Sequence, residues 1–277
     1  MILIRQAVTV RFGLYPDFFR VLEKDEAALK SVFDEAHYAY LDAPFPSLWK
    51  EKLFTYLSLF TENKYCVLRH AAFLTGHGYP SGDRDCGTMA QSEVRDFLLQ
   101  PLPDFSVYAS YLEYLEKMPT INAWPEDDSL FEEAVFWGAV SAFLKDGPYS
   151  DFKLKFRRIL GETFYSRLMS LLAFIQSAHF WAELNAEELS IEPDAEELLR
   201  KYPDLELVLR DRYEALLSRD RTHAGAIYGS NTQVLLQTLT TIEQQPALEG
   251  GEEYDLGYDM ALRRVRGIIS AARKLLS

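Results

Sequence analysis

The chain has 277 residues, of which 48% are apolar, and its 42 acidic and 29 basic side chains give a formal net charge of −13. A chain of this size and composition can bury a large core and forms one large or two modest domains. The negative charge repels nucleic acid and anionic membranes, and no basic stripe offers contacts to phosphates. We therefore expect no nucleic-acid partner.

Cysteine content and hydropathy indicate a cytoplasmic protein. Two cysteines in this length do not make a disulfide framework, and the opening run MILIRQAVTV is interrupted by Arg5 and lacks a small-residue cleavage site. The longest apolar window, LMSLLAFIQSAHFWAEL (168–184), is too short and too polar to span a membrane, which predicts a core helix. We expect no membrane association, no cofactor and no metal.

Helical spacing recurs along the whole chain, and no alternating β-branched run closed by a hairpin turn interrupts it. The fold class is therefore predicted to be all-α. The expected helices, in chain order, cover 25–40, 47–60, 64–76, 89–100, 105–117 and 127–145, then a helix from 151 that breaks at Gly161, a long apolar helix after that break, and a helix that starts at Pro193 and Asp194.

Two segments between these helices stand out. Residues 78–88, GYPSGDRDCGT, have the composition of a loop, and 243–255 form a polar connection. At the start of the last helix named above, Glu197 follows Asp194 by three residues, which is the spacing of a capping box.

One cysteine and one histidine share a helix face. If Asn63 caps the helix over 64–76, Cys66 lies in its first turn, where free N–H groups and the helix dipole favour a thiolate. His70 lies one turn further on the same face and can relay a proton, and the adjacent Arg69 favours negative charge. Glu51, on the preceding helix, is the nearest candidate to orient His70.

Ordinary packing is an open alternative for the same residues. Cys66 and His70 also fit a half-buried helix face, because cysteine is among the residues most often buried. Glu51 belongs to a polar row that is typical of a solvated face, made up of Glu51, Thr55, Ser58 and Glu62.

Two further histidines have their own interpretations. His77 follows His70 by seven residues, so Cys66, His70 and His77 could in principle bind a metal, but glycine ends the helix before His77. His179 lies in an apolar run, which predicts a hydrogen-bonded core histidine.

The spacing of Glu51, Asn63, Cys66 and His70 resembles a known family. It matches the E-x11-C-x2-C-x3-H signature of AhpD-like and carboxymuconolactone decarboxylase-like proteins, with Asn63 in place of the first cysteine. The surrounding segments are also similar: RFGLYPDFF, SLWKEKLFTYLS, YCVLRH, GYPSGD and RRILGETFYSRLMSLLAFIQSAHFWAEL. The resemblance implies an AhpD-like helical domain over 1–193, with 105–145 resembling an insertion, and we expect 194–277 to form a helical extension packed on it.

The resemblance also implies roles for the matching residues. In active family members a cysteine of the Cys66 type attacks peroxide, residues of the Glu51 and His70 types relay protons, and the earlier cysteine resolves the sulfenic acid. Asn63 cannot form that disulfide. Cys86 could replace it only if its Cα came within about 7 Å of that of Cys66, so a thiol from outside is the expected reductant.

Three functions follow as hypotheses. The first is a single-cysteine thiol peroxidase, with a small peroxide and a thiol reductant as partners and a depressed pKa for Cys66. The second is a non-catalytic sensing or scaffold protein, because two segments resemble AhpD-like modules found ahead of bacterial sensor kinases. The third and weakest is a decarboxylase-type acid–base enzyme. Family members assemble as trimers or hexamers, so the resemblance implies a homo-oligomer.

Overall fold

The computed structural model describes residues 2–61 and 64–211, and their regular structure is entirely helical, without a strand. The predicted all-α class is confirmed. The elements are, in chain order, α1 (Ile2–Phe12), α2 (Asp17–Val21), η1 (Leu22–Lys24), α3 (Glu26–Ala36), the π-helical turn η2 (His37–Leu41), α4 (Ser47–Ser58), α5 (Lys64–Leu74), η3 (Pro80–Gly82), α6 (Gln91–Leu99), α7 (Phe105–Lys117), α8 (Ser129–Leu144), α9 (Tyr149–Leu184) and α10 (Pro193–Lys201).

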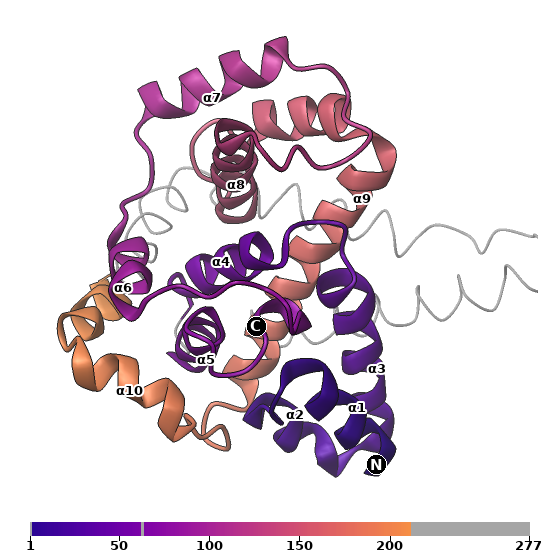
Figure 1. Ribbon diagram of the computed structural model, residues 1–277, viewed down its shortest axis with the longest axis vertical. Coiled ribbons are helices and arrows are strands. Elements are labelled where there is room, and N and C mark those ends of the chain that lie inside the picture. The colour runs from indigo at the N-terminus through magenta and orange to yellow at the C-terminus, as the bar shows by residue number, and fades with distance from the viewer. Residues whose placement is uncertain (1, 62–63, 212–277) are drawn as a thin grey trace, which may run out of the picture. The chain divides into compact units, whose positions relative to one another are not determined.

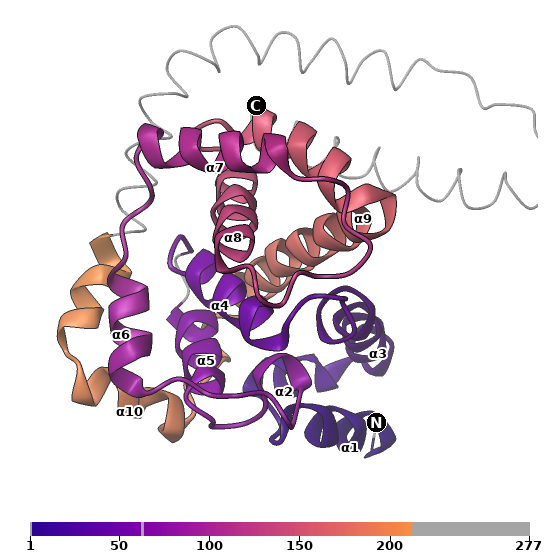
Figure 2. The ribbon, with the colours of Figure 1, turned by 45° about the horizontal axis from the view of Figure 1, so that its top comes forward.

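Helices α4 and α5 pack side by side at the centre of the described chain (Figure 1). Helix α8 and the second half of α9 cover α4, while α10 packs against α5. In Figure 2, α7 and α8 lie together with the first part of α9, and α1 to α3 lie at the opposite end. Almost every side chain of α4 and α5 is consequently buried, including polar ones.

The predicted helices are found close to their expected bounds, because glycine and proline stop helices by local chemistry. Helices α1 and α2 were not predicted. At the other end, the expected capping box is wrong: α10 begins at Pro193 with Glu192 at its N-cap, and no side chain caps it. Proline at the first helical position has no N–H that requires a cap. The Asp194 carboxylate does not cap the helix and instead forms an ion pair with Arg69 of α5.

The predicted break at Gly161 is confirmed as a sharp kink inside α9. Gly161 has φ 63° and ψ 173°, a conformation that is essentially restricted to glycine. The carbonyl groups just before the kink are bonded by the segment that precedes α8: Thr120 Oγ1 donates to Arg158 O at 3.0 Å, and Ile121 N donates to Ile159 O at 2.8 Å. The kink therefore costs little hydrogen bonding.

None of the helices in the described ranges combines the length and the hydrophobicity that crossing a bilayer requires. Helix α10 begins at Pro193, one residue before the predicted extension 194–277. Arg69 of α5 pairs with Asp194, and Lys64 of α5 pairs with Glu206. The polar connection over 243–255 lies outside the described residues. The division of the chain at residue 193 stays a prediction.

Candidate functional site

Glu51 lies inside the protein and not on a solvated face. Its side chain is 0% exposed, and Thr55 and Ser58 of the same polar row are also buried. The solvated interpretation of this row is therefore wrong for these three residues, and Glu62 lies outside the described residues. Because α4 is covered on every side, the row that a sequence pattern assigns to water instead faces α5, α9 and η3.

Local hydrogen bonds make this burial tolerable. Thr55 Oγ1 donates to Glu51 O at 2.7 Å, and Ser58 Oγ donates to Phe54 O at 2.8 Å, so both hydroxyls are satisfied within their own helix. Ser58 Oγ also lies 2.8 Å from His179 Nε2. The prediction of a hydrogen-bonded core histidine at 179 is confirmed.

Glu51 and His70 form a buried pair. Glu51 Oε1 lies 2.6 Å from His70 Nδ1, and the imidazole stacks on Phe54 with ring centroids 3.6 Å apart. An Nδ1–H that donates to Oε1 leaves Nε2 of a neutral imidazole as an acceptor. The predicted orienting role of Glu51 thus has the geometry that it requires.

The other carboxylate oxygen of Glu51 has partners that the sequence did not suggest. Tyr40 donates its hydroxyl to Oε2, and Ser81 donates its backbone N–H at 2.5 Å, while the Ser81 hydroxyl donates to Ser47 O at 2.9 Å and lies 3.3 Å from Oε2. Tyr40 comes from η2 and Ser81 from η3, far from each other in the chain. The sequence analysis identified 78–88, which includes Ser81, as a loop from its composition. That composition does not predict a contact between Ser81 and Glu51.

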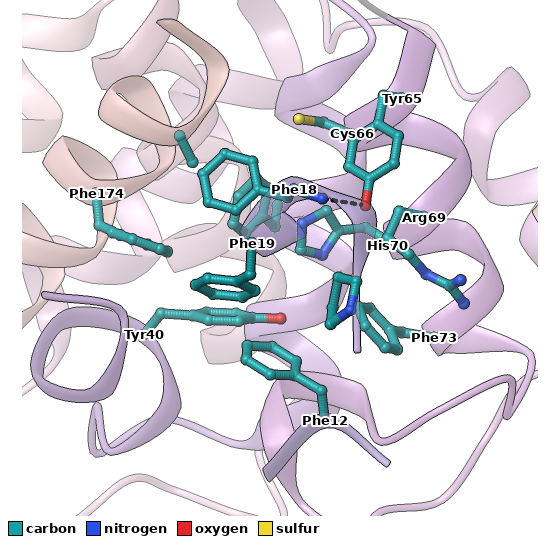
Figure 3. Close-up of a pocket in the computed structure, with 13 residues that line it drawn as sticks. Phe12, Phe18, Phe19, Tyr40, Tyr65, Cys66, Arg69, His70, Phe73 and Phe174 are labelled. Carbon is teal, nitrogen blue, oxygen red and sulfur yellow. Dashed lines mark hydrogen bonds between the residues drawn. The ribbon is translucent and has the colours of Figure 1, made fainter. Parts of the chain in front are cut away.

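A small cavity of about 40 Å³ lies beside His70. Figure 3 shows that aromatic rings form most of its wall, and that Cys66 and His70 reach it from α5. Phe18 and Phe19 of α2 also line it. The structure therefore brings the predicted Cys66 and His70 to one cavity, with Glu51 directly behind the imidazole.

Cys66 is a buried neutral thiol and not the expected thiolate. It lies in the first turn of α5, as predicted, but it is only 3% exposed. Burial, assisted by the charge of Glu183, raises the pKa of Cys66 to about 12. No hydrogen bond joins its sulfur to His70 within the described ranges, and the proposed cap Asn63 lies outside them. The predicted depression of the pKa is wrong, because desolvation opposes the effect of a helix N-terminus.

Arg69 does not stabilise a thiolate. Its guanidinium is 2% exposed, donates to Asp194 at 2.9 and 3.3 Å and to His77 O at 2.7 Å, and lies over the Phe73 ring. The side chain lines part of the cavity, and Figure 3 shows its guanidinium directed away from Cys66. The predicted contribution of Arg69 to a negative charge at Cys66 is therefore wrong, since its charge is directed toward α10.

Tyr65 connects the cavity wall to the segment before α10. Its hydroxyl accepts a hydrogen bond from Phe18 N at 3.0 Å and donates one to Glu192 Oε1, also at 3.0 Å. Asp17 N donates to the same carboxylate oxygen at 2.9 Å. Glu192 thus holds the N-terminus of α2, and with it Phe18, in place. No local sequence pattern predicts this long-range contact.

The remaining candidates do not join the site. Cys66 and Cys86 are both free thiols, and Cys86 does not line the cavity. His77 follows the end of α5 and contacts Thr75 Oγ1 at 3.0 Å. In the part of the chain that the structure describes, no three His, Cys, Asp or Glu side chains form a group that could hold a metal ion.

Comparison with known proteins yields no relative: no protein-family model, no curated protein and no solved structure matches this chain.

Proposed function

We propose that this protein is an AhpD-like single-cysteine thiol peroxidase that reduces small hydroperoxides at Cys66. The observation that carries the proposal is the buried Glu51–His70 pair, held at 2.6 Å, at the wall of the cavity that Cys66 also lines. An acid–imidazole pair beside a thiol is the arrangement in which a base removes the thiol proton as the nucleophile attacks. The motif spacing of Glu51, Cys66 and His70 supports the same assignment.

The proposed reaction starts from the neutral thiol. Cys66 Sγ attacks one peroxide oxygen, an S–O bond forms as the O–O bond breaks, and His70 Nε2 passes the thiol proton to the departing alkoxide or hydroxide. Glu51 stabilises the imidazolium that forms on the way. The products are Cys66 sulfenic acid and an alcohol or water. Two external thiols then return Cys66 to the thiol, releasing water and their own disulfide.

The size of the cavity supports a small substrate. On the scale used for such spaces, about 10–15 Å³ admits one water molecule, so the cavity of about 40 Å³ admits only a few heavy atoms. Hydrogen peroxide and the shortest alkyl hydroperoxides meet this limit, whereas a fatty acid hydroperoxide exceeds it. An apolar, aromatic wall also favours a neutral oxidant over an anion.

The raised pKa of Cys66 favours a second candidate. A thiol that stays protonated can be part of the cavity wall while Glu51 and His70 perform acid–base chemistry on a small neutral substrate. A third candidate, a non-catalytic sensing or scaffold protein, requires no reaction at all.

For the cellular setting, we propose the cytoplasm, because both cysteines are free thiols. We also propose that the protein forms a homo-oligomer, because Ile2, Leu3 and Val10 of α1 are exposed apolar side chains that a second copy could cover.

Peroxide consumption by point variants tests the proposal. With dithiothreitol as reductant, we expect the wild-type protein and Cys86→Ser to consume hydrogen peroxide. Cys66→Ser should be inactive. Glu51→Gln and His70→Gln should consume peroxide about 100-fold more slowly than the wild type. A sulfenic-acid-trapping dione should label Cys66 only in the active proteins.

The alternatives give different outcomes. A wild-type protein that leaves peroxide untouched, or a Cys66→Ser variant as active as the wild type, contradicts the thiol peroxidase. An acid–base activity would instead survive Cys66→Ser and fail in His70→Gln.

A further inference from the structure

Two hydrogen-bond donors converge on one oxygen of Glu51. Tyr40 supplies its hydroxyl and Ser81 its backbone N–H at 2.5 Å, both to Oε2, while the Ser81 hydroxyl donates to Ser47 O at 2.9 Å and lies 3.3 Å from the same carboxylate oxygen. The opposite oxygen, Oε1, is left for His70. Tyr40, Glu51 and Ser81 are all almost fully buried, so these contacts are not exchanged with water.

Both donors come from unusual backbone. Tyr40 lies in the π-helical turn η2, a form that is rare and is found frequently at functional sites. Ser81 has φ 49° and ψ 30°, and is one of two non-glycine residues with positive φ in the described ranges. Such conformations cost free energy and persist only where the surrounding structure enforces them.

A buried lysine holds the π-helical turn in place. Lys50 Nζ donates to Tyr40 O and Leu41 O at 2.8 Å and to Ala43 O at 3.3 Å, so it binds the carbonyl end of η2. Lys50 is the residue directly before Glu51 on α4. The same stretch of α4 therefore fixes the backbone of Tyr40 and receives its hydroxyl.

We propose that Tyr40 and the backbone N–H of Ser81 are positioning groups that hold the Glu51 carboxylate turned toward His70. Hydrogen bonds to a carboxylate are among the stronger ones, and two donors on Oε2 fix the plane of the group. In the described structure neither group hydrogen-bonds to the sulfur, so the Tyr40 hydroxyl and the Ser81 N–H act through Glu51, whereas the Tyr40 ring, which the test keeps, lines the cavity and packs edge-on against His70. The consequence for catalysis rests on the proposed function, whereas the consequence for the His70 hydrogen bond does not.

The test compares two buried tyrosines. Tyr40→Phe removes the hydroxyl on Glu51 and keeps the ring, while Tyr56→Phe is the matched control, because Tyr56 is equally buried and its hydroxyl donates to Gln100 O at 2.9 Å, away from the cavity. The readout is the NMR resonance of the His70 Nδ1 proton in protein labelled with ¹⁵N-histidine. We expect a downfield chemical shift for this proton, and the resonance is assigned because it is missing from the spectrum of His70→Gln.

We expect Tyr40→Phe to move or broaden this resonance and Tyr56→Phe to leave it unchanged. In the peroxide assay, kcat should fall about 10-fold or more, the change for a lost hydrogen bond to a charged group, with KM preserved. An unchanged His70 resonance in folded Tyr40→Phe protein overturns the proposal.

Two controls separate the possible failures. If the wild type consumes no peroxide, the proposed function fails, and the resonance alone decides the role of Tyr40. If Tyr40→Phe does not fold, a ring-fluorinated tyrosine at position 40 keeps the shape and makes the hydroxyl more acidic. The inference then requires the His70 resonance to shift, and a resonance that stays in place contradicts it.

Discussion

Arg69 binds Asp194 through both Nη atoms, at 3.3 and 2.9 Å from the two carboxylate oxygens, although 125 residues separate them in the chain. This ion pair attaches the start of α10 to the middle of α5. It also directs the positive charge of Arg69, three residues after Cys66, toward α10 and not toward the sulfur. The resting thiol is therefore neutral, and any chemistry at Cys66 depends on proton removal by His70.

The first prediction concerns thiol reactivity. Burial raises the pKa of Cys66 to about 12. At about pH 7.5, iodoacetamide should therefore alkylate Cys66 in the native protein far more slowly than it alkylates a free cysteine. Cys86, which is less buried, is the internal comparison and should react first. Mass spectrometry of the two peptides over time measures both rates. In urea, where the protein is unfolded, Cys66 and Cys86 should be alkylated at equal rates. Fast alkylation of Cys66 in the native protein would contradict its burial.

The second prediction concerns the coupling of Glu51 and His70. Glu51→Leu should lower the free energy of unfolding by about 3–5 kcal/mol, because it leaves His70 and the Tyr40 hydroxyl without their buried acceptor. His70→Leu should also destabilise, but the double variant should be less destabilised than the sum of the two. Urea unfolding of the four proteins measures this coupling.

A control pair calibrates that cycle. Tyr56→Phe shares no hydrogen bond with Glu51 in the described structure, so its effect should add to that of Glu51→Leu. If the Glu51 and His70 effects also add, the two side chains are energetically independent, and the buried pair has no special role.

The third prediction concerns Asp194 and acid. Burial acts to raise the pKa of Asp194, but the hydrogen bond and charge of Arg69 outweigh it, so the pKa lies below its usual value. A carboxyl with a depressed pKa in the folded state stabilises the protein above its unfolded pKa of about 3.9 and loses that contribution as the pH falls through the folded value. Asp194→Asn should therefore be less stable than the wild type at neutral pH, with a smaller difference at pH 3 or thereabouts.

Urea unfolding across this pH range measures the Asp194 effect. Asp34→Asn is the control, because Asp34 forms an exposed i,i+4 pair with Lys30 and should change stability little at any pH. A difference between wild type and Asp194→Asn that grows toward acid would reverse the assigned sign.

The fourth prediction concerns His179. Burial, with a smaller effect of the nearby His70, lowers the pKa of His179 to about 3. An unfolded histidine titrates near 6.5, so unfolding takes up one proton between these values, and stability is complete above about 6.5 and falls below it. The slope attributable to His179 is about 1.4 kcal/mol per pH unit. His179→Gln should remove that slope, whereas His37→Gln, at the surface, should retain it.

Local chemistry made much of the fold predictable. Glycine and proline placed the helix ends, and Gly161 predicted the kink in α9, because a positive φ is a property of the residue itself. Helix α2 was missed because it has only five residues, and the fixation of its start by Glu192 is a long-range contact.

The site divides in the same way. Helix spacing placed Cys66 and His70 on one face, because residues four apart on a helix are neighbours, and the resemblance to a family motif added Glu51. Spacing could not select Tyr40 or Ser81, since each reaches Glu51 through an irregular backbone turn that no periodic pattern predicts.

The sequence by itself determined the all-α class, the helix order and the placement of Cys66 and His70 on one face of α5. Only the tertiary structure decided that the polar row of α4 is buried, that Arg69 serves Asp194, and that Cys66 is a neutral thiol. The physical reason is that the free energy of a charge depends on its distance from water and from other charges, and both are set by segments far apart in the chain.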